Sequence, residues 1–122
     1  MKIITRHIDC LKLDISYVVG GNAQENHDII DAAQPDDIWF HISNQPSCHV
    51  IASMPTDHII TKPELHRILK QGALICIQQS NVEISKSNKS NKTDVEWTRI
   101  QNVTKMDIPG KVLAEKVRII SI

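Results

Sequence analysis

Two apolar segments near the middle of the chain constrain its fold most strongly. Residues 37–43 read Asp-Ile-Trp-Phe-His-Ile-Ser, residues 48–54 read Cys-His-Val-Ile-Ala-Ser-Met, and Asn-Gln-Pro-Ser separates them at 44–47. Both segments are dense in β-branched or aromatic residues, which predicts a pair of strands. Their apolar residues are nearly continuous instead of alternating, so we expect these strands at the centre of a sheet that is covered on both sides.

The start of the chain has a different pattern. Residues 12–19 alternate polar and apolar side chains with a period of two, and the short mixed segment 2–8 is compatible with a strand. Residues 9–11 are then a tight connection between the two strands. The sequence therefore predicts an opening hairpin.

Two helices are predicted from their start signals. Gly20-Gly21 and a later proline bound the segment 23–33, and Asn22 stands at its N-cap position. Thr61-Lys62-Pro63-Glu64 combines a threonine cap, a proline in the first turn and a glutamate at the third helical position. Apolar residues then recur at three- and four-residue steps, which predicts a long second helix to about Gln79.

The remainder of the chain predicts further strands. We expect a strand over 94–100, a short run over 102–106, a turn at 108–110, and a closing strand pair over 111–114 and 116–122. Strands and helices do not alternate in a βαβ rhythm, so the 122 residues (13.8 kDa) are expected to form one α+β domain. Its sheet should be largely antiparallel, with one short and one long helix.

The charges balance overall but are divided along the chain. Fourteen basic and fourteen acidic residues give zero net charge, which excludes a histone-like polybasic protein. The net charge is +2 over 1–12, −7 over 13–61 and +5 over 62–122. This division predicts an acidic face and a basic face, and a polyanion would bind the basic one. We expect 85–93, which contains three lysines and no apolar residue, to form an exposed, mobile basic loop.

The cysteines and the N-terminus indicate where the protein works. Cys10, Cys48 and Cys76 are an odd number at wide spacing, which favours neither a disulfide framework nor a zinc ribbon. The first residues contain no long apolar stretch of the kind found in a signal peptide, and no segment has the length of a membrane span. We therefore expect a cytoplasmic protein with no membrane partner, and neither a cofactor nor a metal.

An ordered set of motifs runs from about Tyr17 to the C-terminus. Its most specific element is Asp-Ile-Trp-Phe-His at 37–41, followed eight residues later by the second histidine, His49. The whole set is Gly20-x-Asn22-x-x-x-Asn26, Asp36 to His41, Ser47-x-His49-Val50, the helix with Ala73, Val95-x-Trp97-Thr98, and Pro109-Gly110-Lys111-Val112. In composition, order and spacing this set resembles the NFACT-R domain. Two positions depart from the family pattern, because Gly21 replaces a basic residue and Ser47 replaces a common glycine.

The resemblance implies an RNA-binding module without chemistry of its own. The expected partner is structured RNA, either tRNA or ribosomal RNA, in translation or ribosome-associated quality control, with the large ribosomal subunit as a possible setting. A protein partner is a further possibility. The residues expected to bind RNA are Asn22, Asn26, His41, His49, Lys86, Lys89, Lys92, Arg99, Lys105 and Lys111; those expected to maintain the motif structure are Gly20, Asp37, Trp39, Val50 and Gly110.

Several motif residues have more than one interpretation. His41 and His49 could face each other beside Cys48 as metal ligands or a catalytic pair, as buried hydrogen-bonded histidines, or as donors to a phosphate or base. Asp37 could bind a ligand or pair with an arginine, but the favoured interpretation is that it satisfies backbone N–H groups or a nearby histidine. Trp39 is expected in the core rather than as a stacking platform.

Alternative functions also remain open. The turn at 20–22 could cradle a phosphate at a helix start, or simply connect strand to helix with Asn22 as cap. The acidic stretch 14–57 could dock a protein partner, which would make the chain an adaptor in the same pathway. DNA binding and a small His-dependent enzyme have low weight.

Overall fold

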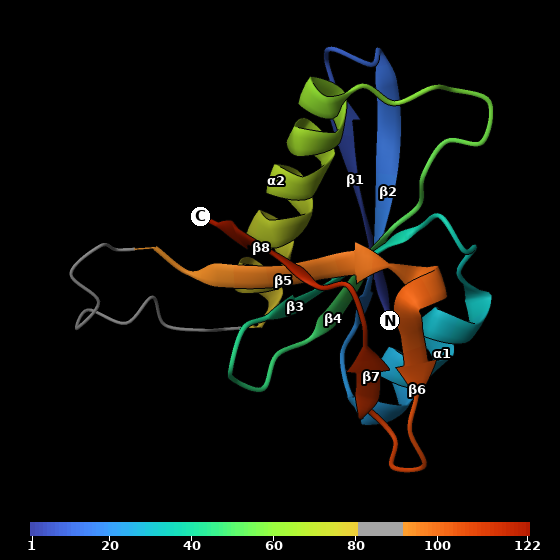
Figure 1. Ribbon diagram of the computed structural model, residues 1–122, viewed down its shortest axis with the longest axis vertical. Helices are drawn as coiled ribbons and strands as arrows, with labels where there is room; N and C mark the ends of the chain where they lie inside the picture. The colour runs from blue at the N-terminus through green and yellow to red at the C-terminus, as the bar shows by residue number, and fades with distance from the viewer. Residues whose placement is uncertain (81–91) are drawn as a thin grey trace.

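The computed structural model describes residues 1–80 and 92–122 of the protein, and most of the predicted basic loop lies outside this description. Within the described residues, two helices, a six-stranded antiparallel sheet and a small second sheet confirm the α+β class (Figure 1). The elements in chain order are β1 (Lys2–Ile8), β2 (Leu13–Gly20), α1 (Ala23–Ala32), β3 (Ile38–Ile42), β4 (His49–Ala52), α2 (Lys62–Gln79), β5 (Asp94–Arg99), a 3₁₀ turn (Ile100–Asn102), β6 (Val103–Lys105), β7 (Val112–Ala114) and β8 (Arg118–Ser121).

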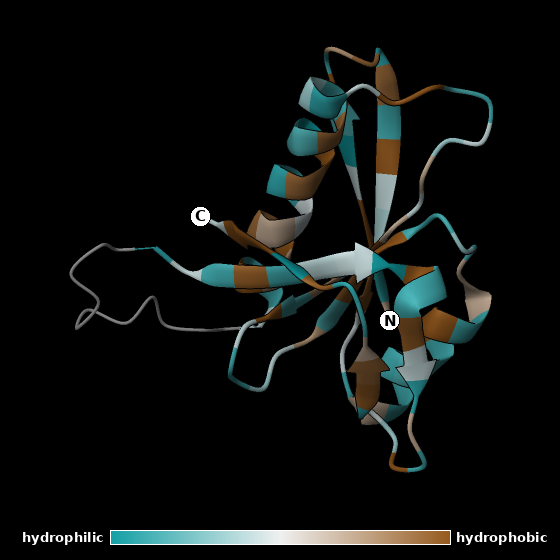
Figure 2. Cartoon of the chain, in the orientation of Figure 1, coloured by the Kyte–Doolittle hydropathy of each residue, from teal (hydrophilic) through white to brown (hydrophobic). Residues whose placement is uncertain are grey.

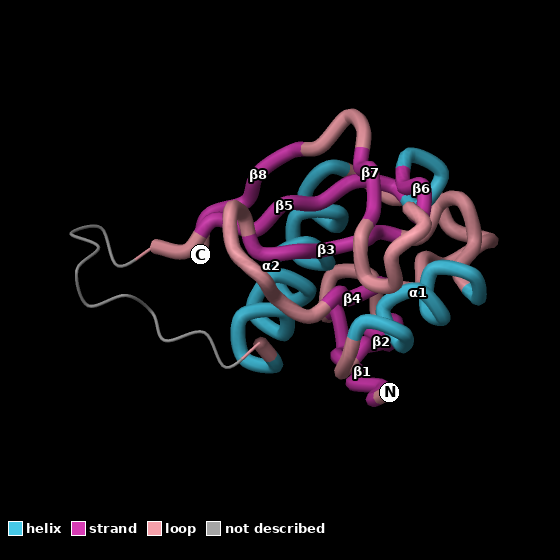
Figure 3. The backbone as a smooth tube through the Cα atoms, turned by 90° about the horizontal axis from the view of Figure 1, so that it is seen from below, coloured by secondary structure: helices cyan, strands magenta, loops and turns pink. Residues whose placement is uncertain are grey.

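The large sheet has the strand order β1-β2-β4-β3-β5-β8, which can be followed across Figure 3. β1 and β2 form the predicted hairpin, which the N–H of Leu11 closes by donating to the carbonyl of Ile8 at 3.0 Å. β3 lies between β4 and β5, with Phe40 opposite Val50 on one side and Trp97 on the other. The two apolar segments are therefore central strands, as predicted.

Both faces of these central strands are covered. Phe40 belongs to the main core, which α2 completes, and the Tyr17 hydroxyl donates to the carbonyl of Ile68 at 2.8 Å within it. Trp39 points to the opposite face and packs in a smaller core with Ile29 of α1 and Ile100. Figure 2 shows hydrophobic residues of α2 recurring on the side that faces the sheet. Continuous apolar strands are stable here because helices cover the sheet on both sides.

Both helices begin at the predicted caps. The hydroxyl of Thr61 accepts the N–H of Glu64 at 3.4 Å, and the Glu64 carboxylate accepts the N–H of Thr61 at 2.8 Å, which is a complete capping box. The side chain of Asn22 accepts the N–H of Glu25 at 2.9 Å and starts α1. In the described part of the chain, no helix is both long and apolar enough to cross a membrane.

The predicted closing strand pair is wrong. β7 pairs with β6 in the small sheet, and β8 pairs with β5 at the edge of the large sheet. The hydroxyl of Thr98 donates to the carbonyl of Glu115 at 2.9 Å, and the N–H of Glu115 donates to the carbonyl of Asn102 at 2.9 Å. Lys116 follows with a φ of 53°. These contacts turn the chain from one sheet into the other, so two neighbouring strands do not form a hairpin.

Gly72 of α2 allows the helix to lie close to the central strand β3. A Cβ atom at this position would lie 2.3 Å from Cζ of Phe40, whose side chain is fully buried. We expect Gly72→Ala to lower the free energy of unfolding by about 2 kcal/mol, because overpacking outweighs the better helix propensity of alanine. Urea denaturation measures the difference.

The double variant separates this contact from a general effect on the helix. Phe40→Leu removes the ring atoms that the new methyl group would meet, so the additional cost of Gly72→Ala should be clearly smaller in that background. The same cost in both backgrounds would show that Phe40 is not the cause.

Candidate nucleic-acid interface

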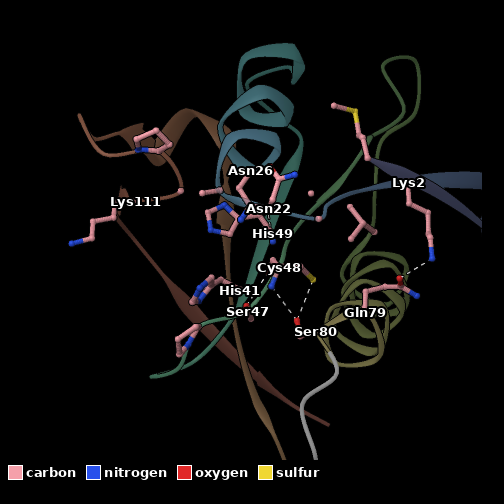
Figure 4. A pocket seen from close by; sticks show the side chains of 18 of the residues that line it. Lys2, Asn22, Asn26, His41, Ser47, Cys48, His49, Gln79, Ser80 and Lys111 are labelled. Carbon is pink, nitrogen blue, oxygen red and sulfur yellow. Dashed lines mark hydrogen bonds between the residues drawn. The ribbon is translucent and has the colours of Figure 1, made fainter.

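A groove with a volume of about 850 Å³ lies where the start of α1, the end of α2 and the β6–β7 loop meet one end of the large sheet (Figure 4). Three segments far apart in the sequence supply most of its wall, namely 19–23, 46–49 and 108–111. We call it the motif groove, because these segments carry the family motifs. Its other lining residues are Met1, Lys2, Asn26, His41, Gln79 and Ser80.

Gly20 and Asn26 hold α1 against the sheet. A Cβ atom on Gly20 would lie 2.2 Å from Oδ1 of Asn26, so only glycine permits this approach. The same Oδ1 accepts the backbone N–H of His49 at 3.2 Å. The side chain of Asn26 lines the groove, where its amide N–H groups are available as hydrogen-bond donors.

The start of α1 is already satisfied by an acidic side chain. The Glu25 carboxylate accepts the N–H of Gly21 at 2.8 Å, while Asn22 caps the N–H of Glu25. Glutamate therefore occupies the position that a phosphate would take at the helix start. The structure favours the connecting turn, with Asn22 as cap, over the phosphate cradle.

Trp39, His41 and His49 form one cluster across β3 and β4. The rings of Trp39 and His41 stack with centroids 5.7 Å apart, and the two histidine rings meet edge to face at 5.3 Å. The indole N–H of Trp39 donates to Nδ1 of His49 at 3.2 Å. The histidines thus face each other as expected, and the indole fixes the neutral His49 tautomer with its proton on Nε2.

Burial keeps both histidines uncharged at neutral pH. It lowers the pKa of His49 to about 4, and the nearby rings of His41 and His27 add to this shift. Burial also lowers the pKa of His41, although the carboxylate of Glu96 partly offsets it. The pair can therefore donate and accept hydrogen bonds but adds no positive charge. Among the described residues, no group of three or more histidine, cysteine or acidic side chains is arranged to hold a metal ion.

Asp37 and Trp39 have structural roles. The carboxylate of Asp37 accepts the N–H of Gln34 and the N–H of Met54, each at 2.9 Å. Trp39 is 2 % exposed, so it is a core residue and offers no open ring face for stacking. Val50 of β4 pairs with Phe40 and is fully buried in the main core on the other face of the sheet. The predictions of a backbone-satisfying aspartate and a core tryptophan are confirmed.

Gly110 brings the β6–β7 loop onto the start of α1. It has a φ of +86°, which favours glycine, and a Cβ atom there would lie 3.0 Å from Cβ of Ala23. The next residue of the loop, Lys111, is held by α1 as well, because Nε2 of His27 lies 3.1 Å from the backbone carbonyl oxygen of Lys111. This packing places Lys111 at the groove wall.

The charge at the motif groove is basic. Lys2 and Lys111 flank it on opposite sides (Figure 4), and among its described lining residues there is no aspartate or glutamate. Lys2 donates to the side chain of Gln79 at 3.1 Å. Most of the wall comes from region 13–61, which is strongly acidic. None of the seven acidic side chains of this region is among the lining residues of the groove. One carboxylate nevertheless lies beside the wall, because Glu25 accepts the N–H of Gly21 at 2.8 Å and pairs with the N-terminal ammonium of Met1 at 2.7 Å, so its negative charge already has a partner within the fold.

The structure brings five of the predicted RNA-binding residues together in the motif groove, namely Asn22, Asn26, His41, His49 and Lys111. Two others lie elsewhere. Arg99 donates to the backbone carbonyl of Asp36 at 2.7 Å, and Lys105 pairs with Asp31 at 2.6 Å. Lys92 is exposed and does not line the groove, while Lys86 and Lys89 lie outside the described residues.

Sequence patterns missed several residues of the wall. Lys2 arrives from the first strand, while Gln79 and Ser80 arrive from the end of α2. None of them belongs to a recognisable motif, so only the tertiary fold reveals their position. Cys48 lies between the motif residues Ser47 and His49, so its place in the wall could have been inferred from these neighbours.

The comparisons with known proteins agree with this class of module. The model of the family described as "NFACT protein RNA binding domain" matches residues 12–116. The chain therefore belongs to the NFACT RNA-binding domain family, and this membership supports a nucleic-acid-binding module without indicating catalysis.

Related proteins share the domain over part of their length. Coiled-coil domain-containing protein 25 from Danio rerio is 30% identical over 93 residues, and the same protein from Mus musculus is 25% identical over 93 residues. In each case the match covers 74% of this chain and 42% of the relative, so the chain spans less than half the length of these relatives.

A solved structure shares the fold. It is the C-terminal part of the fibronectin/fibrinogen-binding protein from Streptococcus suis, which matches with a TM-score of 0.68 and 22% identity. The match covers 88% of this chain and 41% of that chain. At this identity, the likeness establishes the common fold.

The lowered pKa of His49 makes the fold sensitive to acid. The unfolded chain, in which histidine has a pKa of 6.5, takes up this proton first as the pH falls. Neutral, buried His49 therefore makes its full contribution to the free energy of unfolding above pH 6.5. This contribution is lost as the pH falls toward 4, and the loss amounts to about 3 kcal/mol in all. Urea denaturation between pH 7 and pH 4.5 should show less of this loss in His49→Asn, whose amide oxygen can still accept the Trp39 N–H.

His66 offers the matched control, because it is exposed on α2. His66→Asn should leave the pH dependence of the unfolding free energy close to that of the unmodified protein. If His49→Asn and His66→Asn give the same pH profile, His49 is not a source of the acid sensitivity.

Proposed function

We propose that the protein binds structured RNA, tRNA or ribosomal RNA, in translation or ribosome quality control, and that it carries out no chemistry of its own. The observation that supports this most directly is the composition of the motif groove. Family motif residues from three separate segments line it, lysines flank it, and its described wall has no acidic side chain. Such a groove suits a sugar–phosphate backbone.

The proposed contacts are of two kinds. Lys2 and Lys111 supply point charges for phosphates at the two sides of the groove. Asn26, His41 and His49 offer hydrogen bonds from neutral groups between them. Because burial withholds the Trp39 ring from bases, we expect recognition through backbone and shape rather than base stacking.

The lysines outside the groove extend the proposal. Lys86 and Lys89 belong to the segment that begins directly after the groove residue Ser80, and Lys92 follows it. We assign to them phosphate contacts with parts of the RNA that continue beyond the groove. Arg99 and Lys105 have intramolecular partners, so we assign to them only a contribution to the long-range electrostatic attraction of RNA.

A salt titration tests the two groove lysines. We expect the double variant Lys2→Gln/Lys111→Gln to bind tRNA and ribosomal RNA hairpins more weakly, because two phosphate contacts are removed. The slope of log affinity against log salt should fall by about one for each lysine lost, and the loss should be similar for all sequences. Fluorescence anisotropy between low and moderate salt measures both quantities.

Lys70→Gln is the matched control, since Lys70 is exposed on α2 away from the groove. This variant removes one positive charge but should retain the salt slope and most of the affinity. The proposal fails if the unmodified protein does not bind these RNAs at low salt, or if binding is independent of salt.

The adaptor hypothesis receives less support from the contacts. Glu25, Asp31 and Asp37 each have an intramolecular partner, and His7 pairs with Asp14 at 2.8 Å. The acidic stretch is thus used largely within the fold. A protein partner that remains bound after nuclease treatment would nevertheless favour the adaptor over RNA binding.

A further inference from the structure

Two cysteines separated by 28 residues lie together at the wall of the motif groove, Cys48 in the wall and Cys76 behind it. Cys48 stands directly before β4, is half-buried and lines the groove, as Figure 4 shows. Cys76 is buried in the last turn of α2, four residues before Ser80. One thiol is therefore accessible from the groove and the other is inside the core.

The contacts between them are reciprocal. The Cys48 thiol lies 3.6 Å from the carbonyl oxygen of Cys76, and the Cys76 thiol lies 3.6 Å from the carbonyl oxygen of Cys48. Ser80 completes the cluster, because its hydroxyl lies 3.1 Å from the Cys48 sulfur and accepts the Cys48 N–H at 3.1 Å. Both thiols are free. The fold thus brings two reduced cysteines and one hydroxyl together.

We propose that Cys48 and Cys76 form a peroxide-reactive dithiol, in which Cys48 reacts with a hydroperoxide at the motif groove and Cys76 then closes an intramolecular disulfide. Cys48 is the attacking thiol because it is the accessible member of the pair. Cys76 is the resolving thiol because it lies directly behind Cys48. The proposal concerns the two thiols and does not depend on RNA binding.

The surroundings of Cys48 favour the reactive thiolate. A hydrogen bond from the Cys76 thiol lowers the pKa of Cys48 to about 7, and the Ser80 hydroxyl acts in the same direction against the effect of burial. A substantial fraction of Cys48 is then ionised at neutral pH, and the thiolate is the form that attacks peroxides. The single proton of the Ser80 hydroxyl is donated to the Cys76 carbonyl at 2.6 Å, so Ser80 can turn this proton to the sulfur only by giving up that bond.

The first step oxidises Cys48. Its thiolate attacks one oxygen of hydrogen peroxide, so that an S–O bond forms while the O–O bond breaks. The sulfur gives up two electrons, and the departing hydroxide takes a proton from solvent to become water. The product is a sulfenic acid on Cys48.

The second step uses Cys76. Its pKa is raised chiefly by the hydrogen bond with Cys48, then by burial and by the Cys48 charge. Oxidation of Cys48 to a neutral sulfenic acid removes the charge, which makes Cys76 easier to ionise. Cys76 loses its proton and attacks the Cys48 sulfur. The S–S bond forms, the S–O bond breaks, and the hydroxide leaves with that proton as water.

The experiment uses the Cys10→Ser variant, because Cys10 is an exposed third thiol. Graded hydrogen peroxide is added to the folded protein, the reaction is quenched in acid, and the remaining thiols are alkylated after unfolding. We expect both thiols to be lost together, the intact mass to fall by two hydrogen atoms, and dithiothreitol to restore both. A non-reducing gel should show monomer, since the disulfide is intramolecular.

Single-thiol variants in the same background test the assigned roles. Cys76→Ala should stop the reaction at a Cys48 sulfenic acid, which dimedone traps, and Cys48→Ser should leave the buried Cys76 reduced. Circular dichroism confirms that each variant is folded. The proposal is overturned if Cys48 proceeds to sulfinic acid while Cys76 keeps its thiol in the parent variant. It is equally overturned if both thiols survive peroxide concentrations that oxidise Cys10 in the unmodified protein.

Discussion

The hydrogen bond from the Trp39 indole to Nδ1 of His49, 3.2 Å long and buried, is the interaction on which the motif groove depends. It ties β3 to the start of β4 through side chains, because Trp39 pairs with Ile51 in the backbone register whereas His49 lies beyond the last pair of the two strands. The backbone of the same His49 then donates to Asn26, whose side chain lies against Gly20. One continuous series of contacts therefore runs from the sheet to α1. It explains why a tryptophan, a histidine, an asparagine and a glycine belong to one motif.

These contacts also explain how a neutral protein can present a basic groove. The region 13–61 has seven acidic residues and no basic ones, yet the residues that it contributes to the wall are uncharged glycine, asparagine, histidine, serine, cysteine, valine, alanine and proline. Several of its acidic residues have partners within the fold: Glu25 pairs with the N-terminal ammonium and the N–H of Gly21 beside the groove, Asp37 accepts backbone N–H groups, and Asp31 pairs with Lys105. Zero net charge describes the whole molecule, whereas a ligand meets the local field.

Local signals made much of the fold predictable. Capping residues such as Asn22 and Thr61 bond to backbone groups within one helical turn, so the sequence next to them predicts where each helix begins. The continuous apolar runs in β3 and β4 predicted that both faces of these strands would be covered. The β7–β8 pairing was mispredicted because a contact distant in sequence, from Thr98 to the carbonyl of Glu115, decides where the chain turns. The motif residues of the groove were expected from the family resemblance, and no local pattern predicted that they would line one groove. Lys2 and Ser80 were not, because only tertiary packing brings them to it.

The departure at Gly21 illustrates how the fold can offset a lost side chain. In the family pattern this position is basic, but here its N–H is held by the carboxylate of Glu25. The β1–β2 register sets Lys2 opposite Val19, one residue before Gly20, so a lysine from the neighbouring strand stands beside the same turn. The positive charge at this end of the groove therefore depends on strand pairing rather than on the motif itself. A change that shifts the hairpin register would move Lys2 away from the turn without altering any motif residue.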